Sequence, residues 1–429
     1  MIERFLKLCA DNATKTAFIV KNKKITYSQL LKDVYKMIDF FKAKNIKAGD
    51  KILLFLLPSY DFYVLLFACI YYGVNIVVPD SYKNKRNVEN IVKTKKIEYA
   101  FCNNVTFLFK SKLPKIIKYY NISTYKNFEG LYSKPNEKED LTVLTTFTSG
   151  TTGMPKAIER NYELLKLQIE SISQNVDFSG LERVYASLPI YVLFVVFSGR
   201  TCVLNGKINA KYLKKIQVDT IIAPIISTLK AKGDFSFIKK VFLGGARIYQ
   251  KEGRYLAEKF ACASVNYVYG ASECALIATT DLNYYLNHGC SLKRIISGID
   301  LSLVNVDNNG VGVISVNGKS VISNDNIYIS NDLGVITDNG LKIVGRSKYC
   351  GKGFYNYLVD EELLSDNPKV KRGFSLMHGN KIYFCYEGRI TKKESGITYV
   401  KFLRLPMDAK HKTKLDYARV LNKILAKNK

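Results

Sequence analysis

The sequence predicts an α/β protein: a large N-terminal domain of doubly wound sheets with a small β-barrel-like module, followed by a small mobile α+β C-terminal domain. Two patterns carry this prediction. Strand-like and helix-like segments alternate over the first 135 residues, as in parallel sheets covered by helices. From residue 295 to residue 344, short strands separated by Asn- and Gly-rich turns replace them.

The first elements follow in chain order. Apolar residues recur at helical spacing over residues 28–44, and residues 51–57 are a compact apolar strand entered through an Ala-Gly-Asp turn. Residues 62–72 indicate a buried helix and residues 75–78 a further strand. Strands and helices in this order are typical of a parallel sheet.

The length of 429 residues allows two or three domains at about 150 residues each. A polar linker at residues 134–139 and the change of pattern near residue 286 suggest the boundaries. We expect an N-terminal domain over residues 1–346 and a C-terminal domain over residues 347–429. The expected subregions of the first are about 1–135, 140–285 and 286–346.

Composition narrows the functional classes. The 65 lysine and arginine residues exceed the 37 aspartate and glutamate residues by 28 charges, but they are spread along the whole chain. This distribution argues against a nucleic-acid ligand and favours anionic substrates or a peripheral contact with an anionic membrane. The nine cysteines form no Cys-x-x-Cys pair, and the N-terminus lacks the apolar run of a signal peptide, so we expect a cytoplasmic protein.

The strongest motif is the segment from Leu141 to Lys156, LTVLTTFTSGTTGMPK. It places an apolar strand before a loop in which two glycines allow backbone N–H groups to converge, as polyphosphate binding requires. It is not a Walker A loop, because Pro155 stands where that motif requires glycine. The groups offered to phosphate come from Thr148, Ser149, Gly150, Thr151, Thr152, Gly153 and Lys156.

This loop resembles the signature of the AMP-forming adenylating enzymes, the family of acyl-CoA synthetases, luciferases and peptide-synthetase adenylation domains. Four further segments are similar to motifs of that family and stand in the expected order: Leu243-Gly244-Gly245-Ala246, Tyr269-Gly270-Ala271-Ser272-Glu273, Ser330-Asn331-Asp332-Leu333-Gly334 and Gly345-Arg346.

The resemblance implies ATP, Mg²⁺ and CoA as cofactors. It assigns Glu273 to Mg²⁺, Ser272 to the α-phosphate, Tyr269 to the adenine, and Asp332, with Arg346 beside it, to the ribose. The implied catalytic residues are Lys414, Glu273, Thr148 and Lys156. The implied nucleotide-binding residues are Thr148, Ser149, Gly150, Thr151, Thr152, Gly153, Lys156, Gly244, Gly245, Ala246, Tyr269, Gly270, Ser272, Asp332 and Arg346.

The family also places one lysine near the C-terminus, where it bridges the carboxylate and the α-phosphate. An alignment that includes Asp408 and His411 assigns this role to Lys414, whereas counting from Pro406 assigns it to Lys412. The resemblance further implies a hinge two residues after the Gly-Arg motif, at Lys348.

The segment after Leu188-Pro189 carries no charged side chain, although relatives that activate amino acids place an aspartate there. A buried ammonium without a partner is costly, so a medium- or long-chain apolar acid is favoured. The predicted acid pocket comprises Tyr191, Val192, Gly245 and Ala271.

The implied reaction is ATP-dependent activation of this acid to acyl-AMP, with release of pyrophosphate, followed by transfer to CoA. The resemblance lies closest to the fatty-acid–CoA ligase branch. Two alternatives remain: a β-lactone synthetase acting on a β-hydroxy acid, and a stand-alone adenylation enzyme that loads an acyl carrier protein. The expected assembly is a monomer or a homodimer.

Overall fold

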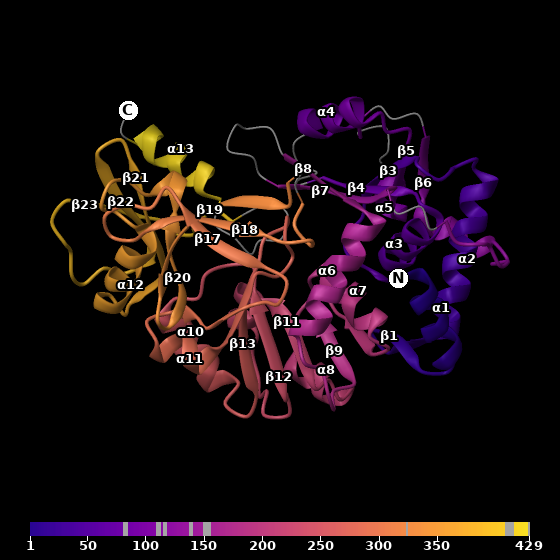
Figure 1. Cartoon of the computed structure of the whole chain (residues 1–429), viewed down its shortest axis with the longest axis horizontal. Helices are drawn as coiled ribbons and strands as arrows, with labels where there is room; N and C mark the ends of the chain where they lie inside the picture. The colour runs from indigo at the N-terminus through magenta and orange to yellow at the C-terminus, as the bar shows by residue number, and fades with distance from the viewer. Residues whose placement is uncertain are drawn as a thin grey trace. The chain divides into compact units, whose positions relative to one another are not determined.

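The structure, a computed structural model, describes residues 1–79, 85–108, 113–114, 118–136, 140–148, 156–322, 325–407 and 416–427. The chain, coloured along its sequence in Figure 1, folds into two compact units. The first unit comprises Met1–Gly206, Gln217–Ile222 and Ser272–Ala275. The second comprises Lys207–Ile216, Ala223–Ala271 and Leu276–Lys429.

The first unit alternates strands and helices. In chain order these are α1 (Ile2–Asp11), β1 (Thr16–Val20), β2 (Lys23–Thr26), α2 (Tyr27–Ala43), β3 (Lys51–Phe55), α3 (Tyr60–Tyr72), β4 (Asn75–Val78), α4 (Lys85–Lys95), β5 (Tyr99–Cys102), α5 (Asn104–Leu108), β6 (Lys118–Asn121), η2 (Ile122–Asn127), β7 (Thr142–Thr148), β8 (Lys156–Asn161), α6 (Tyr162–Asn175), β9 (Arg183–Ala186), α7 (Pro189–Phe197), β10 (Thr201–Leu204) and the start of β11 (Thr220–Pro224).

Six of these strands form a sheet in the order β6-β5-β3-β4-β7-β8. Neighbouring strands are parallel from β6 to β7, and only β8 runs antiparallel to its neighbour β7. Parallel strands of one sheet require crossover connections, which α3 supplies from β3 to its neighbour β4, and α4 supplies from β4 to β5 on the other side of β3. The β7–β8 hairpin therefore lies at one edge of the sheet.

The predicted early elements are confirmed, and local capping explains two of them. Thr26 and Gln29 form a capping box at the start of α2, each side chain accepting a hydrogen bond from the other's backbone N–H. The Ser59 hydroxyl caps α3, which ends at Gly73 with φ of +80°. The strands predicted at residues 51–57 and 75–78 are β3 and β4.

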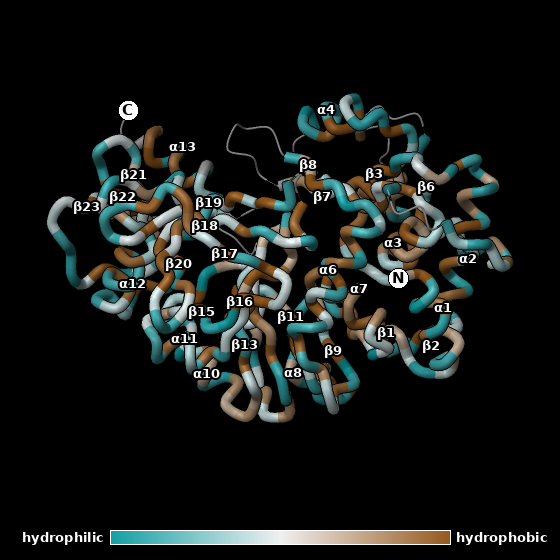
Figure 2. The backbone as a smooth tube through the Cα atoms, in the orientation of Figure 1, coloured by the Kyte–Doolittle hydropathy of each residue, from teal (hydrophilic) through white to brown (hydrophobic). Residues whose placement is uncertain are grey.

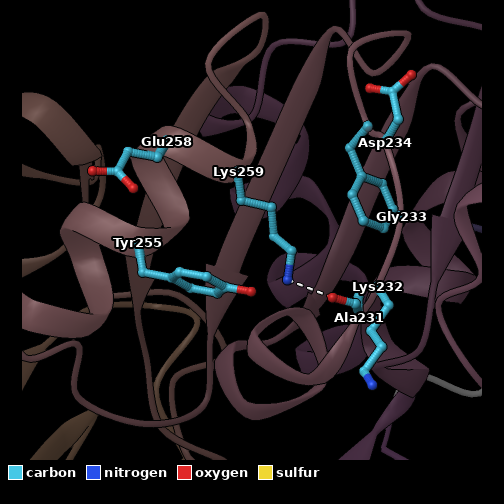
Figure 3. Close-up of a pocket in the computed structure, with 8 residues that line it drawn as sticks. Ala231, Lys232, Gly233, Asp234, Tyr255, Glu258 and Lys259 are labelled. Atoms are coloured by element: carbon cyan, nitrogen blue, oxygen red, sulfur yellow. Dashed lines mark hydrogen bonds between the residues drawn. The ribbon is translucent and has the colours of Figure 1, made fainter.

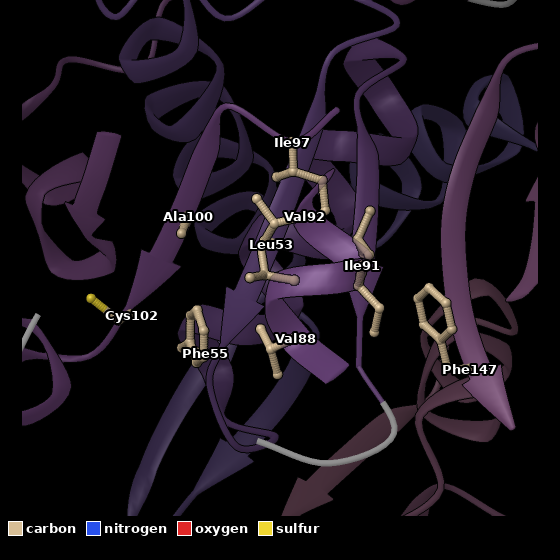
Figure 4. Close-up of a cluster of buried hydrophobic side chains, with 10 residues drawn as sticks. Leu53, Phe55, Val88, Ile91, Val92, Ile97, Ala100, Cys102 and Phe147 are labelled. Atoms are coloured by element: carbon tan, nitrogen blue, oxygen red, sulfur yellow. The ribbon is translucent and has the colours of Figure 1, made fainter. Parts of the chain in front are cut away.

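The sheet is packed on hydrophobic side chains. Every residue from Phe62 to Tyr71 in α3 is buried, and Figure 2 shows the hydrophobic character of β3 and α3. A second cluster packs α4 against β3, β4, β5 and the end of β7 (Figure 4), and it consists of Leu53, Phe55, Val77, Val88, Ile91, Val92, Ile97, Ala100, Cys102 and Phe147. Phe147 thus anchors β7 directly before the predicted phosphate-binding loop.

The remaining strands of the first unit belong to a second sheet, in the order β11-β9-β10-β1-β2. The pairs from β11 to β1 are parallel, and β2 returns antiparallel to β1. The strand at residues 16–20, β1, therefore pairs with a strand that comes much later in the sequence, β10 at Thr201–Leu204. Residues 1–135 consequently contribute to two sheets.

The second unit contains α8 (Ala210–Lys215), the end of β11, α9 (Ile225–Lys230), β12 (Lys240–Gly244), α10 (Gln250–Lys259), β13 (Ser264–Tyr269), β14 (Ala278–Asp281), α11 (Leu282–Asn287), β15 (Ser291–Leu292), β16 (Arg294–Ile295), β17 (Asp300–Val304), β18 (Gly312–Asn317), β19 (Ile327–Thr337), β20 (Gly340–Arg346), η3 (Ser347–Tyr349), α12 (Asn356–Asp366), β21 (Val370–His378), β22 (Lys381–Gly388), β23 (Ile397–Lys401) and α13 (Tyr417–Lys427).

In this unit, β12 and β13 are parallel, and β14 and β16 continue from β13 in antiparallel pairs. The predicted β-rich module is an antiparallel sheet in the order β15-β20-β19-β18-β17. One of its predicted turns follows β17, where the Asp307 carboxylate accepts hydrogen bonds from the N–H groups of Asn309 and Val311.

The last part of the chain forms the three-stranded sheet β21-β22-β23. Helix α13 packs on this sheet through Phe374, Leu376, Tyr383, Cys385, Phe402, Leu405, Val420 and Ile424. Helix α12 contacts both β20 and β21, so residues 347–429 pack against the β-rich module here. Their independence as a mobile domain stays a prediction.

Two chain-wide features concern the described residues. The nine cysteines, all within the described ranges, form no disulfide. Over the same ranges, no helix combines the length and the apolar character that crossing a membrane requires.

A buried polar cluster joins α12 to the start of α10. The Tyr249 hydroxyl donates a hydrogen bond to Asp360 Oδ2 at 2.6 Å, and the Ser375 hydroxyl donates to Asp360 Oδ1 at 2.7 Å. Beside them, Arg247 Nη2 lies 3.3 Å from Glu361 Oε1. Asp360 is fully buried, and this burial raises the pKa of its carboxyl group to about 7.

The raised pKa of Asp360 predicts a pH-dependent stability. Its value in unfolded chains is about 3.9, so between about pH 4 and pH 7 the folded protein binds the additional proton and its stability falls as the pH rises. Asp360→Asn removes this titration. We expect the variant to gain stability relative to the wild type across this window, by on the order of 1 kcal/mol per pH unit, in urea unfolding.

A matched control lies on the same helix. Asp366 pairs with Lys392 at 2.6 Å, but the lysine side chain is 66% exposed, so Asp366→Asn should show little dependence on pH. A constant difference in unfolding free energy between Asp360→Asn and the wild type from pH 4 to pH 8 would contradict the prediction.

Candidate functional site

The predicted phosphate-binding loop is the connection between β7 and β8. Thr148 and Lys156 are register partners at the end of the strand pair, so the hairpin brings the two ends of the loop together. Lys156 is exposed. The other predicted phosphate ligands lie outside the described residues: Ser149, Gly150, Thr151, Thr152 and Gly153.

Inside this hairpin, β8 carries a buried arginine. Arg160 is 7% exposed, and its Nε donates to Gln168 Oε1 at 3.0 Å while Nη1 donates to Thr146 Oγ1 at 3.0 Å. Nη2 donates to the backbone carbonyl of Ser272. The amide Nε2 of Gln168 donates to the next carbonyl, that of Glu273, at 3.3 Å. Two side chains thus hold the loop that carries two predicted site residues.

The charges in this region are few and close together. Burial lowers the pKa of Arg160 to about 10, and the nearby Glu273 opposes that shift, so the guanidinium is charged at neutral pH. Glu273 itself is 7% exposed, whereas Ser272 is exposed. A buried carboxylate oxygen is a ligand type that Mg²⁺ prefers, so Glu273 fits the predicted metal role chemically.

The predicted acid-binding residues of the first unit lie on α7. Tyr191 and Val192 are buried, as is every following residue of this helix to Phe197. Aromatic contacts fix the helix, with Phe194 next to Phe178 and Phe197 next to Phe5. The role of Tyr191 and Val192 in an acid pocket stays a prediction.

In the second unit, two predicted segments follow neighbouring parallel strands. Gly244 ends β12, where a Cβ atom would meet Val268 Cγ2 at 2.7 Å, so only glycine fits this close strand pairing. Gly245 adopts φ of +83°, a conformation that favours glycine whether or not a ligand is bound. Because carboxyl ends of parallel strands meet at one edge, the segments after β12 and β13 share that edge.

The end of β13 contributes Tyr269 to a three-residue cluster. The Tyr269 hydroxyl donates to Asp332 Oδ2 at 2.9 Å, and Arg346 Nε donates to Asp332 Oδ1 at 3.0 Å. Asp332 and Arg346 are register partners on β19 and β20. The structure therefore brings together three residues that the sequence places far apart.

This cluster fits the predicted ribose contact. Each carboxylate oxygen has two lone pairs, so Asp332 keeps acceptor capacity after accepting from Tyr269 and Arg346. The Asp332 carboxylate raises the pKa of Arg346. Burial, with a smaller contribution from Asp332, raises the pKa of Tyr269. The Arg346 guanidinium is therefore charged at neutral pH. Such an acceptor, fixed in place before binding, suits a pair of hydroxyl donors.

The remaining predicted residues are only partly described. Gly270 and Ala246 are exposed, and Ala271 is half-buried. Lys348 is exposed on η3, between β20 and α12. Lys412 and Lys414 lie outside the described residues, as do Asp408 and His411. Among the residues that the structure describes, no group of three or more His, Cys, Asp or Glu side chains is arranged to hold a metal ion.

An open hollow of about 480 Å³ in the second unit contains none of the predicted site residues. Figure 3 shows its lining residues, among them Asp234, Tyr255, Glu258 and Lys259. The Lys259 ammonium donates to the carbonyls of Ala231 at 2.5 Å and Thr228 at 2.9 Å. This lysine therefore stabilises the end of α9.

Sequence reasoning missed Arg160 and Gln168. The sequence did contain an indication of Arg160. Ile158 and Arg160 lie two residues apart on β8, so their side chains are on the same buried face of the strand. A charged residue at a buried strand position needs a specific partner. The partners on α6 and on the Ser272–Glu273 loop could not be read from spacing.

The chain is similar in sequence to one protein family profile and to several known proteins. The profile of the AMP-binding enzyme family matches residues 5–327. VraA of Staphylococcus haemolyticus, whose name assigns it to long chain fatty acid-CoA ligases, is 23% identical over 283 residues, which cover 62% of this chain and 57% of VraA. The 2-succinylbenzoate–CoA ligase of Staphylococcus epidermidis is 22% identical, covering 82% of this chain and 79% of that protein.

Solved structures share the fold. The o-succinylbenzoate CoA synthetase (MenE) of Bacillus subtilis, solved with an acyl-adenylate intermediate, gives a TM-score of 0.83 at 16% identity and covers 97% of each chain. ATP-bound MatB of Rhodopseudomonas palustris gives 0.81 at 14% identity over 98% of each chain. These likenesses confirm the predicted α/β class.

The family profile spans three of the five motifs, those between Leu141 and Glu273, and the fold agrees along nearly the whole chain. The chain belongs to the AMP-binding enzyme family.

Proposed function

We propose that this protein is an AMP-forming acid–CoA ligase. It joins a carboxylic acid to ATP, forming acyl-AMP and pyrophosphate, and then transfers the acyl group to the sulfur of CoA with release of AMP. The observation that carries the proposal is the Tyr269–Asp332–Arg346 cluster, an oriented carboxylate in the position of a family motif. Relatives and structural neighbours named as CoA ligases or synthetases support it.

In this proposal, residues at the ends of β12, β13, β19 and β20 bind the nucleoside. Asp332 accepts hydrogen bonds from the two ribose hydroxyls, while Arg346 holds the carboxylate in place through its Nε–Oδ1 hydrogen bond and Tyr269 offers its ring to the adenine. The glycines at the end of β12 keep the backbone free of side chains where the nucleoside approaches. These groups bind and orient the nucleotide but move no proton.

The phosphates are assigned to the β7–β8 loop and to the loop of Ser272 and Glu273. Lys156 and the hydroxyl and N–H groups of the β7–β8 loop neutralise the triphosphate, and Ser272 contacts the α-phosphate. Glu273 would hold Mg²⁺, and the bound cation would supply charge neutralisation at the phosphates. In the reaction, an acid oxygen attacks the α-phosphorus and the bond to pyrophosphate breaks. Lys414 bridges the acid and the α-phosphate during this attack.

For the acid, we propose a medium- or long-chain apolar substrate. The residues from Tyr191 to Phe197 on α7 carry no charge, which disfavours an acid with an ammonium group. The name of VraA supports a fatty acid, whereas the name of the S. epidermidis relative favours an aromatic acid as the second candidate. Val192, Gly245, Tyr191 and Ala271 are the proposed pocket residues.

For the second half-reaction, we propose that residues 347–429 turn about Lys348 to replace Lys414 with the incoming thiol. Ser347 and Lys348 are exposed on η3, which connects β20 to α12, and this is consistent with a pivot there. CoA is the proposed acceptor. An acyl carrier protein and an intramolecular hydroxyl, as in β-lactone formation, are the alternatives.

The decisive experiment is acid-dependent ATP–pyrophosphate exchange. The panel contains octanoate, dodecanoate, palmitate, 2-succinylbenzoate and phenylalanine, and each active acid is retested for AMP release with and without CoA. We expect the fatty acids to support ATP–pyrophosphate exchange and CoA to stimulate AMP release with those acids. Phenylalanine should support no exchange. The proposed activity would be refuted if none of the acids in the panel supported exchange.

Glu273→Gln should reduce Mg²⁺-supported exchange by roughly 100-fold or more, because an amide replaces the charged oxygen ligand. Initial rates over a series of Mg²⁺ concentrations measure the effect. Glu258→Gln, in the hollow of the second unit, is the matched control and should retain wild-type rates. Near-wild-type exchange in Glu273→Gln would remove Glu273 from the site.

Lys414→Ala should abolish most acyl-AMP formation and leave thioester formation from supplied acyl-AMP largely intact, because this lysine is assigned only to the first half-reaction. Lys412→Ala tests the alternative alignment. Two assays, pyrophosphate release and thioester formation from acyl-AMP, separate the steps. If Lys412→Ala shows the selective loss and Lys414→Ala does not, the assignment shifts by two residues.

A further inference from the structure

We propose that Arg160 is a positioning residue for the adenylation step: it holds the backbone of Ser272 and Glu273 so that the Glu273 carboxylate is presented to the Mg²⁺ that accompanies ATP. The inference rests on the proposed function. It concerns the connection between the phosphate-loop hairpin and the Glu273 loop, both of which belong to the first unit.

Arg160 uses all three nitrogens of its guanidinium as hydrogen-bond donors. The Arg160 guanidinium donates through Nε, Nη1 and Nη2 to groups on three different segments, Gln168, Thr146 and Ser272. Because the guanidinium is planar and its donors are fixed in direction, these bonds define the orientation of the Ser272 carbonyl relative to the hairpin.

Gln168 extends this control to the next residue. Its Oε1 accepts from Arg160, which leaves its Nε2 directed at the Glu273 carbonyl, 3.3 Å away. Both members of the pair are buried, with Gln168 fully so. Arg160 thus fixes one carbonyl directly and orients the side chain that holds the next one.

The backbone of this loop needs such support. Ala275, two residues after Glu273, has φ of +61°, a left-handed conformation that residues with a Cβ atom rarely adopt. Residues 272–275 also cluster with the first unit although the residues on either side cluster with the second. The bonds from Arg160 and Gln168 to the carbonyls of Ser272 and Glu273 tie this loop to β8 and α6 of the first unit.

Arg160 acts through Glu273 and not on the ligand itself. Its donors bond two side chains and a backbone carbonyl, so the guanidinium holds the loop and the Glu273 carboxylate is the proposed metal ligand. Supporting contacts of this kind typically change metal affinity or activity by about 10- to 100-fold when they are lost.

The test compares Arg160→Lys with Arg200→Lys. Lysine keeps the positive charge but cannot make three directed bonds. Arg200 is a matched control because its guanidinium also bonds backbone carbonyls, those of Leu181, Ser198 and Phe178, in the same unit. A purely structural cost of replacing an embedded guanidinium should appear in both variants.

Two measurements do not require turnover. In the ligand-free protein, hydrogen–deuterium exchange of peptides covering residues 272–275 should be faster in Arg160→Lys and unchanged in Arg200→Lys. In thermal unfolding with ATP, the additional Tm increase given by Mg²⁺ should be lost in Arg160→Lys and retained in Arg200→Lys. The Tm increase given by ATP alone should persist in both.

In the ATP–pyrophosphate exchange assay, Arg160→Lys should raise the Mg²⁺ concentration that gives the half-maximal rate by about tenfold, without changing the KM for the acid. The proposal would be overturned by a folded Arg160→Lys protein in which residues 272–275 exchange hydrogen for deuterium at the wild-type rate and the Mg²⁺ dependence is unchanged. It would also be overturned if Arg200→Lys changed both measurements as much as Arg160→Lys. If none of the acids supports ATP–pyrophosphate exchange by the wild type, the proposed activity is refuted. The Mg²⁺-dependent Tm increase still decides the role of Arg160 in that case.

Should Arg160→Lys fail to fold, Gln168→Met provides the second variant. It removes only the bridge to the Glu273 carbonyl and fills the same volume. The expected result is a shift in the same direction, with faster exchange of residues 272–275 and weaker Mg²⁺ dependence. Wild-type behaviour in both measurements would overturn the proposal.

Discussion

A guanidinium that has lost its water must find acceptors within the protein, and this constraint organises both units. In the first unit, Arg160 meets it by joining a strand, a helix and the loop of Glu273. In the second unit, Arg247, whose side chain is 6% exposed, donates to the Ile343 carbonyl on β20 and pairs with Glu361 on α12. Each arginine fixes segments that no regular hydrogen-bond ladder connects.

Asp332 likewise joins separate segments of the chain through one charged side chain. Its two oxygens accept from Tyr269 on β13 and from Arg346 on β20, so one carboxylate links a mixed sheet to the β-rich module. The partners are close because Asp332 and Arg346 face each other across the β19–β20 pair. A residue in this position is held before any ligand arrives, which lowers the ordering cost of binding.

Sequence reasoning predicted the elements that depend on local patterns. The α2 and α3 helices follow from apolar spacing and from the caps at Thr26 and Ser59, and the family motifs identified Asp332, Tyr269 and Arg346. It could not predict the pairing of β1 with β10, because strand partners distant in sequence leave no local pattern. Arg160 escaped for the same reason, since its acceptors come from three separate segments. The roles assigned to individual site residues remain predictions.

The packing of the C-terminal residues sets a physical condition on the proposed turn about Lys348. A rotation of α12 away from α10 would separate Arg247 from Glu361 and Tyr249 from Asp360, leaving buried charges without partners. Such separations are costly unless new partners or water replace the lost ones. Protonation of Asp360, whose pKa is about 7, would remove one of these charges and lower the cost. The junction between these helices, and not the pivot residue alone, therefore determines how readily the two poses interconvert.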